Sequence, residues 1–398
     1  MTELSFAADF PAMRRDDWMK RVEAVLKGAA FDERLMTETP DGFRLAPIYS
    51  TVDGPRAARE AQQPWTLFQR TDHPEPHSAN AQALDDLANG ATGLNLVIKG
   101  CQEARGCGLD VASLARVLQG VPLHATALRV EGNGGLALAD LISRLPLDPE
   151  RMNVSFGLKD PSAAQALSRR GFTATLMEAD GRPWHERGAT DAEELGAVLA
   201  EAVSFLRSLE QLNDVLLVRA VGVTLTATQD MFATIAKFRA MRLLWARVLD
   251  VVGLPEQSLR LHGETSWKMM ASLDPHTNIL RATAAVFGSG LGGAESICVL
   301  PFSITQGLPN RLARRVARNV QTVLMEESNL WRVADPASGS GYVETLTEML
   351  CQRAWRVFQD AESGRWPSPD SSCRVGEPVV GTSVYRLKTE YPAEVETV

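Results

Sequence analysis

The sequence predicts an α/β protein built as a (β/α)8 TIM barrel, with a helical extension before the barrel and an irregular tail after it. Three observations support this prediction. Strand-like and helix-like segments alternate from about residue 93 onward, the alternation repeats over roughly 270 residues as a barrel requires, and no G-x-G-x-x-G turn follows the first strand-like segment. The last observation disfavours the nearest alternative, a doubly wound open sheet, which usually has fewer repeats and a glycine-rich first turn.

Each predicted strand is a short run rich in apolar or β-branched residues and bounded by turn residues. The predicted strands are Leu94–Lys99, His124–Val130, Met152–Leu158, Phe172–Met177, Arg219–Thr228, Leu259–Ser266, Glu295–Leu300 and Leu330–Ala334. Between them, apolar residues recur at three- and four-residue spacing, which is the period of a helix with one buried face. These helices are predicted at residues 108–119, 136–145, 161–170, 190–210, 229–252, 275–290, 311–329 and 342–361.

The barrel is predicted to span residues 63–363. Residues 1–62 form an N-terminal extension, in which Trp18 and Leu26 belong to an amphipathic helix. Residues 364–398 contain prolines and serines and lack a helical period, which is typical of a tail or linker.

Composition excludes several classes of function. The net charge is −8 and no basic block stands out, so we expect no nucleic-acid surface. The five cysteines are odd in number and scattered, which indicates neither a disulfide framework nor a zinc site. No apolar run approaches the length of a membrane span and the N-terminus lacks a signal-peptide core, so we expect a cytoplasmic protein without a membrane segment.

Alternation along the strands places polar side chains together on one face. Because helices cover the outside of a barrel with apolar contacts, these polar faces must point into the barrel. A polar interior is costly unless it is hydrated, internally hydrogen-bonded or occupied by a polar ligand, so an open centre and a closed hydrogen-bonded core both remain possible. The residues that share such faces are Thr224, Thr226 and Thr228 on one strand, and Arg260, His262, Glu264 and Ser266 on another.

The stretch from Arg315 to Ser340 is the most unusual part of the chain. It is predicted to begin in a helix with an apolar stripe and to continue through the strand Leu330–Ala334 to a Gly339-Ser340-Gly341 turn. Without further information, its arginines and paired glutamates would be a solvated helix face. The residues of the apolar stripe are Leu312, Ala313, Val316, Ala317, Val320, Val323 and Leu324.

This stretch resembles the signature of the methylmalonyl-CoA mutase family, and Pro64-Trp65-Thr66 and residues 227–248 and 291–296 resemble the family's barrel half. The resemblance implies a barrel that serves an adenosylcobalamin-dependent interconversion of methylmalonyl-CoA and succinyl-CoA. It also implies that the pantetheine arm of an acyl-CoA threads the barrel axis between small polar side chains, for which Thr224 and Thr226 are candidates. The signature residues are Arg315, Ala317, Arg318, Asn319, Glu326, Glu327, Arg332, Asp335, Pro336, Gly339 and Ser340.

Four further residues match functional positions of the family. His185 resembles the active-site histidine that hydrogen-bonds the thioester carbonyl, although its spacing to Gly188 matches the family's small, non-catalytic subunits. Arg260 and His262 match substrate-contacting positions, and Glu264 replaces a glutamine there. From the residues alone, His185 could equally be a helix-entry histidine without chemistry, and Arg260 and Glu264 could form a structural pair.

Two departures bear on catalysis. Arg70 stands where catalytic subunits carry a tyrosine over the corrin, and Asp274-Pro275-His276 is not followed by the residues of the D-x-H-x-x-G motif that supplies the cobalt-ligating histidine. We therefore expect adenosylcobalamin only at the level of a complex, with no cofactor or metal bound by a motif of this chain.

Three hypotheses follow. The first is a small structural subunit, a heterodimer partner of a mutase catalytic subunit. The second is a barrel that binds acyl-CoA and works with a separately encoded cobalamin-binding domain. The third is an unrelated barrel enzyme with a phosphate site at Gly339–Gly341.

Overall fold

The computed structural model describes residues 13–57, 59, 63–369 and 378–397, so parts of the predicted extension and tail lie outside the described residues. The chain divides into two compact units, Met1–Ser50 and Thr51–Val398. The first unit contains helices α1 (Arg15–Leu26) and α2 (Phe31–Leu35) and a two-stranded antiparallel sheet of β1 (Thr37–Glu38) and β2 (Arg44–Leu45). Trp18 and Phe31 meet edge to face there, with their ring centroids 6.1 Å apart.

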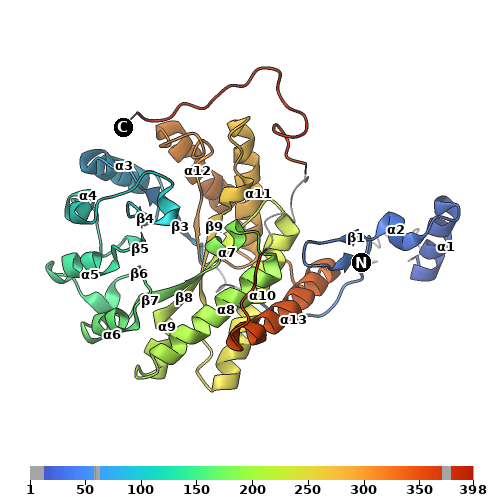
Figure 1. The fold of residues 1–398 in the computed structure, drawn as a ribbon, viewed down its shortest axis with the longest axis horizontal. Helices are drawn as coiled ribbons and strands as arrows, with labels where there is room; N and C mark the ends of the chain where they lie inside the picture. The colour runs from blue at the N-terminus through green and yellow to red at the C-terminus, as the bar shows by residue number, and fades with distance from the viewer. Residues whose placement is uncertain (1–12, 58, 60–62, 370–377, 398) are drawn as a thin grey trace, which may run out of the picture. The chain divides into compact units, whose positions relative to one another are not determined.

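The second unit is a closed barrel of eight parallel strands, which confirms the predicted fold class (Figure 1). The strands follow one another around the ring in chain order, and β10 pairs with both β9 and β3 to close it. The strands are β3 (Thr66–Thr71), β4 (Gly93–Val97), β5 (Ala127–Glu131), β6 (Val154–Leu158), β7 (Thr175–Asp180), β8 (Val221–Ala227), β9 (Arg260–Thr265) and β10 (Ser296–Cys298).

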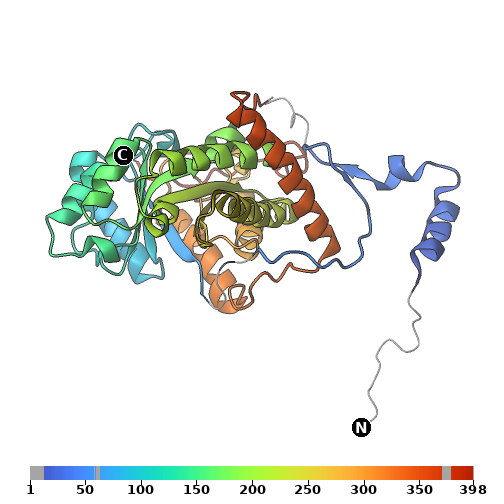
Figure 2. The same ribbon diagram turned by 90° about the horizontal axis from the view of Figure 1, so that it is seen from below.

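Helices lie around this ring of strands (Figures 1 and 2). They are α3 (Pro76–Ala88), α4 (Leu114–Val117), α5 (Gly135–Ser143), α6 (Pro161–Arg169), α7 (Arg182–Glu186), α8 (Asp191–Ser208), α9 (Asp214–Ala220), α10 (Met231–Val252), α11 (Asn278–Leu291), α12 (Arg311–Thr322) and α13 (Gly341–Glu362). Short 3-10 turns occur at η1 (Gln102–Ala104), η2 (Val111–Ser113), η3 (Pro149–Arg151), η4 (Trp267–Met269) and η5 (Pro275–Thr277), and a π-helical turn, η6 (Val323–Glu327), extends α12.

One predicted strand was wrong and one real strand was missed. Residues Leu330–Ala334 form a turn followed by bends instead of a strand, and Asn329 and Asp335 on either side have positive φ angles of 55° and 44°. The first barrel strand is instead β3, whose Gln69 and Arg70 interrupt its apolar pattern. Both side chains are buried because they point to hydrogen-bond partners inside the fold, which a hydropathy pattern cannot show.

The predicted apolar stripe of α12 was also wrong in part. Leu312 is 57% exposed and Val323 is 44% exposed, whereas the charged residues Arg314 and Arg318 are buried. Both guanidiniums pair with Asp86, a buried carboxylate on α3. The last part of the barrel is therefore joined to its first helix by buried ion pairs, and these two arginines are not part of a solvated face.

Asp335 of the family-like signature is likewise structural. Its carboxylate accepts hydrogen bonds from Arg239 of α10 at 2.9 Å and from the backbone N–H of Ala57 at 2.9 Å. Arg239 also pairs with Glu344 of α13, at 2.9 Å. The Glu344 carboxylate accepts the N–H of Gly339 at 3.0 Å, so an acidic side chain occupies the turn where the third hypothesis placed a phosphate.

The described part of the C-terminal tail is irregular and contacts the barrel. Glu396 donates its backbone N–H to the carbonyl of Leu308 at 2.8 Å, and its carboxylate lies 3.2 Å from Nε2 of His73. Trp366, just after α13, stacks on Trp184 with ring centroids 5.7 Å apart. Within the described part of the chain, no helix is long and apolar enough to cross a membrane.

Candidate functional site

The centre of the barrel holds a set of buried ion pairs. Arg129 of β5 donates through Nε to Glu131 at 2.8 Å, and one of its terminal nitrogens pairs with Glu178 of β7. The other terminal nitrogen donates to Oγ1 of Thr224 on β8 at 2.8 Å. Strands β5, β7 and β8 thus contribute the cation and its acceptors, and Arg129 and Glu131 meet because side chains two residues apart on a strand share the inward face.

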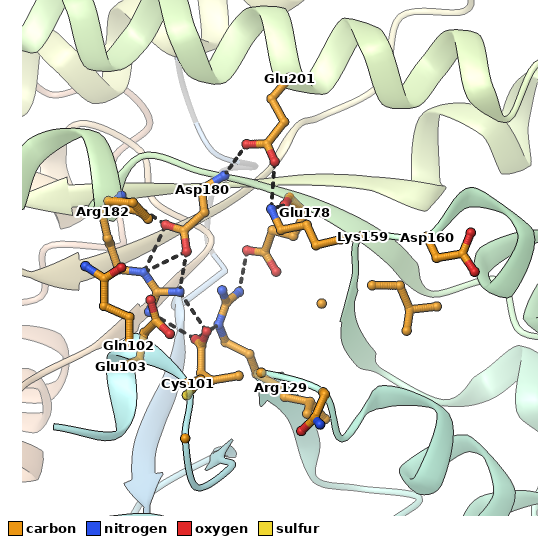
Figure 3. Close-up of a pocket in the computed structure, with 18 of the residues that line it drawn as sticks. Cys101, Gln102, Glu103, Arg129, Lys159, Asp160, Glu178, Asp180, Arg182 and Glu201 are labelled. Atoms are coloured by element: carbon orange, nitrogen blue, oxygen red, sulfur yellow. Dashed lines mark hydrogen bonds and ion pairs between the residues drawn. The ribbon is translucent and has the colours of Figure 1, made fainter. Parts of the chain in front are cut away.

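Arg182, which opens α7 directly after β7, extends the ion pairs across the lumen. It donates to Asp180 at 2.8 Å, to Glu131 at 2.7 Å and to Glu264 of β9 at 3.1 Å. Figure 3 shows Arg182 beside Asp180 and Arg129 beside Glu178. We call these six residues the axial plug: Arg129, Glu131, Glu178, Asp180, Arg182 and Glu264.

Each guanidinium of the plug contacts more than one carboxylate. Burial opposes ionisation of Glu131, but the guanidiniums of Arg129 and Arg182 outweigh it and hold the pKa of Glu131 well below its usual range. Burial raises the pKa of Glu264, although Arg182 partly offsets this effect. Charged groups in such a site are stable only when paired and hydrogen-bonded, as these are.

Two cavities open toward the plug from opposite ends of the barrel. A cavity of about 1180 Å³ lies at the carboxyl ends of β4 to β7, and Figure 3 shows its wall around Lys159, Asp180 and Glu201. A second cavity, of about 530 Å³, lies at the amino ends of the strands. We call them the carboxyl cavity and the amino cavity. Arg129 and Glu178 line both, so the plug is the wall between them.

The structure places the threonine candidates in the closed part of the lumen. Thr224 hydrogen-bonds Arg129 and Glu178, and Thr226 is buried with its backbone N–H donated to Glu194 at 2.8 Å. Neither lines one of the two cavities. The surroundings of Thr224 fit the internally hydrogen-bonded interior that the sequence left open, whereas the Thr226 hydroxyl has no hydrogen-bond partner among the described residues.

His185 is buried away from both cavities. Its Nε2 lies 2.8 Å from Oγ of Ser266, and its Nδ1 lies 3.9 Å from a carboxylate oxygen of Glu194. His185 lines neither cavity, so nothing in this geometry brings it to a thioester. Its catalytic assignment stays a prediction.

The three candidates on β9 follow one inward face from the amino cavity to the plug. Arg260 and His262 line the amino cavity, and Glu264 belongs to the plug. The suggested Arg260–Glu264 pair is wrong, because residues four apart on a strand lie about 13 Å apart and Glu264 pairs with Arg182 instead. Burial is the main cause that lowers the pKa of His262 well below its usual range, and the nearby charges of Arg129 and Arg182 add to it.

The position of the family's corrin-facing tyrosine does not fit that role here. Arg70 is buried, pairs with Asp72 and donates to the backbone carbonyl of Glu103. Where catalytic subunits of the family carry a tyrosine ring, this chain therefore has an arginine that is already paired with Asp72. Among the described residues, no group of three or more His, Cys, Asp and Glu side chains could hold a metal ion.

Most residues of the axial plug were not predicted from the sequence. The inward residues Arg129 and Glu131 alternate with the apolar Leu128 and Val130, and that alternation was the available signal. Arg182 could not be found in this way, because it lies on a helix and reaches the lumen only through the turn after β7.

Comparison with known proteins places this geometry in a family. Residues 173–364 match the family model described as methylmalonyl-CoA mutase. The methylmalonyl-CoA mutase small subunit of Streptomyces virginiae is 36% identical, over 99% of this chain and 74% of that protein. This chain belongs to the methylmalonyl-CoA mutase family. The predicted resemblance is confirmed, and the hypothesis of an unrelated barrel enzyme is wrong.

Other relatives agree with this assignment to the mutase family. A probable methylmalonyl-CoA mutase small subunit of Mycobacterium bovis is 36% identical, over 83% of this chain and 60% of that protein. The small subunit of Propionibacterium freudenreichii subsp. shermanii is 32% identical, over 91% of this chain and 64% of that protein. The chain thus spans between 60% and 74% of the length of these three relatives.

Proposed function

We propose that this chain is the small, structural subunit of a mutase of this family, and that it acts by assembling with a catalytic chain. The axial plug is the observation that carries the proposal. In this reading the barrel axis is closed, and the chain contributes a folded surface to its partner instead of carrying an acyl-CoA along its own lumen.

Energetics supports a closed axis. A pantetheine arm is uncharged along most of its length, so it cannot replace the carboxylates that Arg129 and Arg182 contact. Threading it would separate buried ion pairs, and leaving one partner of such a pair unmatched costs about 3–5 kcal/mol. The contacts of a neutral arm in a polar lumen do not offset several such losses.

The alternative is an acyl-CoA-binding barrel that works with a separately encoded cobalamin domain. The positions of Arg260 and His262 on the amino cavity favour it, since an arginine there could bind a phosphate or carboxylate. In either reading adenosylcobalamin belongs to the complex and supplies the radical chemistry there.

Two measurements test the proposal. Co-expression with a mutase catalytic chain, followed by size-exclusion chromatography with light scattering, is expected to give a stable complex of the two chains. Calorimetric titration of the isolated chain is expected to give equal affinities for succinyl-CoA and for free coenzyme A, because the acyl group makes no contacts of its own in a closed barrel. A chain that stays monomeric beside the catalytic chain would refute the structural role. Micromolar binding that depends on the acyl group would favour the alternative.

A further inference from the structure

We propose that residues 363–369 form a lid over the carboxyl cavity, held closed by the stacking of Trp366 on Trp184. The segment directly follows α13, and both tryptophans line the cavity. The cavity measures about 1180 Å³, which is above the usual range for small-molecule sites, and the axial plug forms its floor. Control of access to this space goes beyond the proposed function and does not depend on it.

The position of Trp184 is fixed by the barrel. Trp184 lies in the five-residue helix α7, whose first residue, Arg182, is tied to the plug by its ion pairs. The guanidinium of Arg187 lies over the Trp184 indole, 4.3 Å from the ring centroid, and its Nε donates to the carbonyl of Pro183 at 3.0 Å. The ring of Trp366 is nearly parallel to that of Trp184, with 11° between their planes. Opening would therefore move the segment after α13 and leave α7 in place.

The lid has few fixed contacts beyond this stack. Its beginning is tied back to α13, since the N–H of Gly364 donates to the carbonyl of Ala361 at 2.9 Å. Among the described residues, none of residues 366–369 forms a hydrogen bond or an ion pair with the barrel. Trp366 is 48% exposed although its ring is stacked. Segments with so few buried contacts open at a low free energy, so the stack decides how often this one opens.

A hinge lies directly after α13. Gly364 has a φ angle of 83°, in the left-handed region that favours glycine, and a Cβ at this position would meet no heavy atom within 4 Å. The glycine therefore serves the turn of the backbone and not close packing. Farther along the chain the tail is attached again, because Arg281 of α11 donates to the carbonyl of Val380 at 2.6 Å. The lid thus lies between two attached parts of the chain.

A closed lid protects the charged floor of the cavity. Arg182 and Asp180 of the plug line the cavity and are 2.8 Å apart, and entering water would weaken such an ion pair by raising the local dielectric constant. An aromatic stack contributes enough to shift an opening equilibrium by about 2- to 12-fold. Loss of the Trp366 ring should therefore raise the open fraction of the lid by that factor and leave the barrel folded.

The thiol of Cys101 measures opening directly, because it lines the carboxyl cavity. Two other thiols are internal controls: Cys107 belongs to the same loop but does not line the cavity, and Cys351 lines a separate groove between α10 and α13. Burial raises the pKa of all three thiols, to about 11 for Cys101, so labelling is slow and rates are compared as ratios between variants. Trypsin cleaves after Arg105 and places Cys101 and Cys107 on separate peptides.

The test is the rate at which iodoacetamide and the larger fluorescein maleimide label each cysteine of the folded chain, followed by peptide mass spectrometry. Trp366→Ala is expected to raise the labelling rate of Cys101 by about 2- to 12-fold, and more for the maleimide. The rates of Cys107 and Cys351 should stay unchanged. Trp366→Phe keeps an aromatic ring and should restore most of the protection. Trp355→Ala is the matched control and should leave the Cys101 rate unchanged, because the half-buried Trp355 of α13 lines the separate groove.

Two results would overturn the lid. One is an unchanged Cys101 rate in Trp366→Ala, and the other is an equal rise at Cys101 and Cys107, which would mean that their shared loop opens instead. Gly364→Ala is a second variant, since strain at a positive φ angle in the closed state should also raise the Cys101 rate. Far-ultraviolet circular dichroism measures the stack itself. The band of the coupled indoles should be lost in Trp366→Ala and kept in Trp355→Ala, and a band that survives in Trp366→Ala would contradict the stack.

Discussion

Replacing Arg129 tests whether the axial plug acts as a coupled unit. Arg129→Met would remove the hydrogen bonds to Glu131 and Thr224, each 2.8 Å long, together with the ion pair to Glu178. Glu131 would keep Arg182 at 2.7 Å, but among the described residues Glu178 would keep only the hydroxyl donors Thr224 and Ser155, the latter at 2.6 Å. A buried carboxylate left without its cation costs about 3–5 kcal/mol, and we expect that loss in the free energy of unfolding.

A double-mutant cycle with Glu178→Gln makes this prediction specific. Arg129→Met is expected to lose about 3–5 kcal/mol, because it leaves Glu178 without its cation. Glu178→Gln is expected to lose less, about 1–3 kcal/mol, because Arg129 keeps Glu131 at 2.8 Å. The double variant removes both charges, so its loss is expected to fall short of the sum by about 2–3 kcal/mol. Urea unfolding followed by circular dichroism and by tryptophan fluorescence measures both quantities. A coupling energy below about 0.5 kcal/mol would refute the view that the plug is one electrostatic unit.

Three further predictions concern a histidine, the signature and a buried hydroxyl. The pKa of His262 is lowered well below 6.5, mainly by burial, so the unfolded chain takes up the proton first and stability falls as the pH drops below 6.5. His262→Gln should reduce the slope of the unfolding free energy against pH, between pH 7 and 5, by up to about 1.4 kcal/mol per pH unit. The control His124→Gln, at an exposed position, should leave that slope unchanged. Asp335→Ala should lower the free energy of unfolding by about 3–5 kcal/mol, because it leaves the buried Arg239 without one of its carboxylates. The control Glu327→Ala changes an exposed signature position and should lower it by less than about 0.5 kcal/mol. Equal losses would contradict the structural role of Asp335. Thr226→Val should be neutral or stabilising by about 1 kcal/mol in urea unfolding, because the Thr226 hydroxyl has no hydrogen-bond partner among the described residues, and a loss above about 1 kcal/mol would show that this hydroxyl is satisfied.

The extent to which the sequence predicted the barrel depended on where each strand places its polar residues. Strands whose polar residues alternate with apolar ones, such as Arg260–Thr265, were recognisable because the alternation has the period of a strand. The strand Thr66–Thr71 was missed because Gln69 and Arg70 are adjacent, and adjacent polar residues break both the alternation and the apolar run.

The candidate site was predicted less well for a different reason. The inward positions of His262 and Glu264 followed from periodicity, but their partners depend on which residues the neighbouring strands bring to the same level of the lumen. That level is set by the register of the barrel, which a single sequence does not contain. Arg182 is the clearest case, because it fills the lumen from a helix.

Burial of charge on α12 was unpredictable for a related reason. The basic residues Arg314 and Arg318 resemble any exposed helix face until Asp86, 228 and 232 residues away along the chain, is placed opposite them.

The same long-range pairing sets the order in which the chain can fold. Strand β3 needs β10 as its neighbour, and Asp86 needs Arg318, which is synthesised 232 residues later. At a translation rate of about 5–20 residues per second, that interval lasts roughly 10–50 s, during which the apolar side of β3 has no permanent cover. Contacts so distant in sequence also slow folding after synthesis. A growing chain of this kind leaves one edge of β3 without its partner strand for most of its time on the ribosome, so its yield in the cell should depend on chaperones that shield such edges.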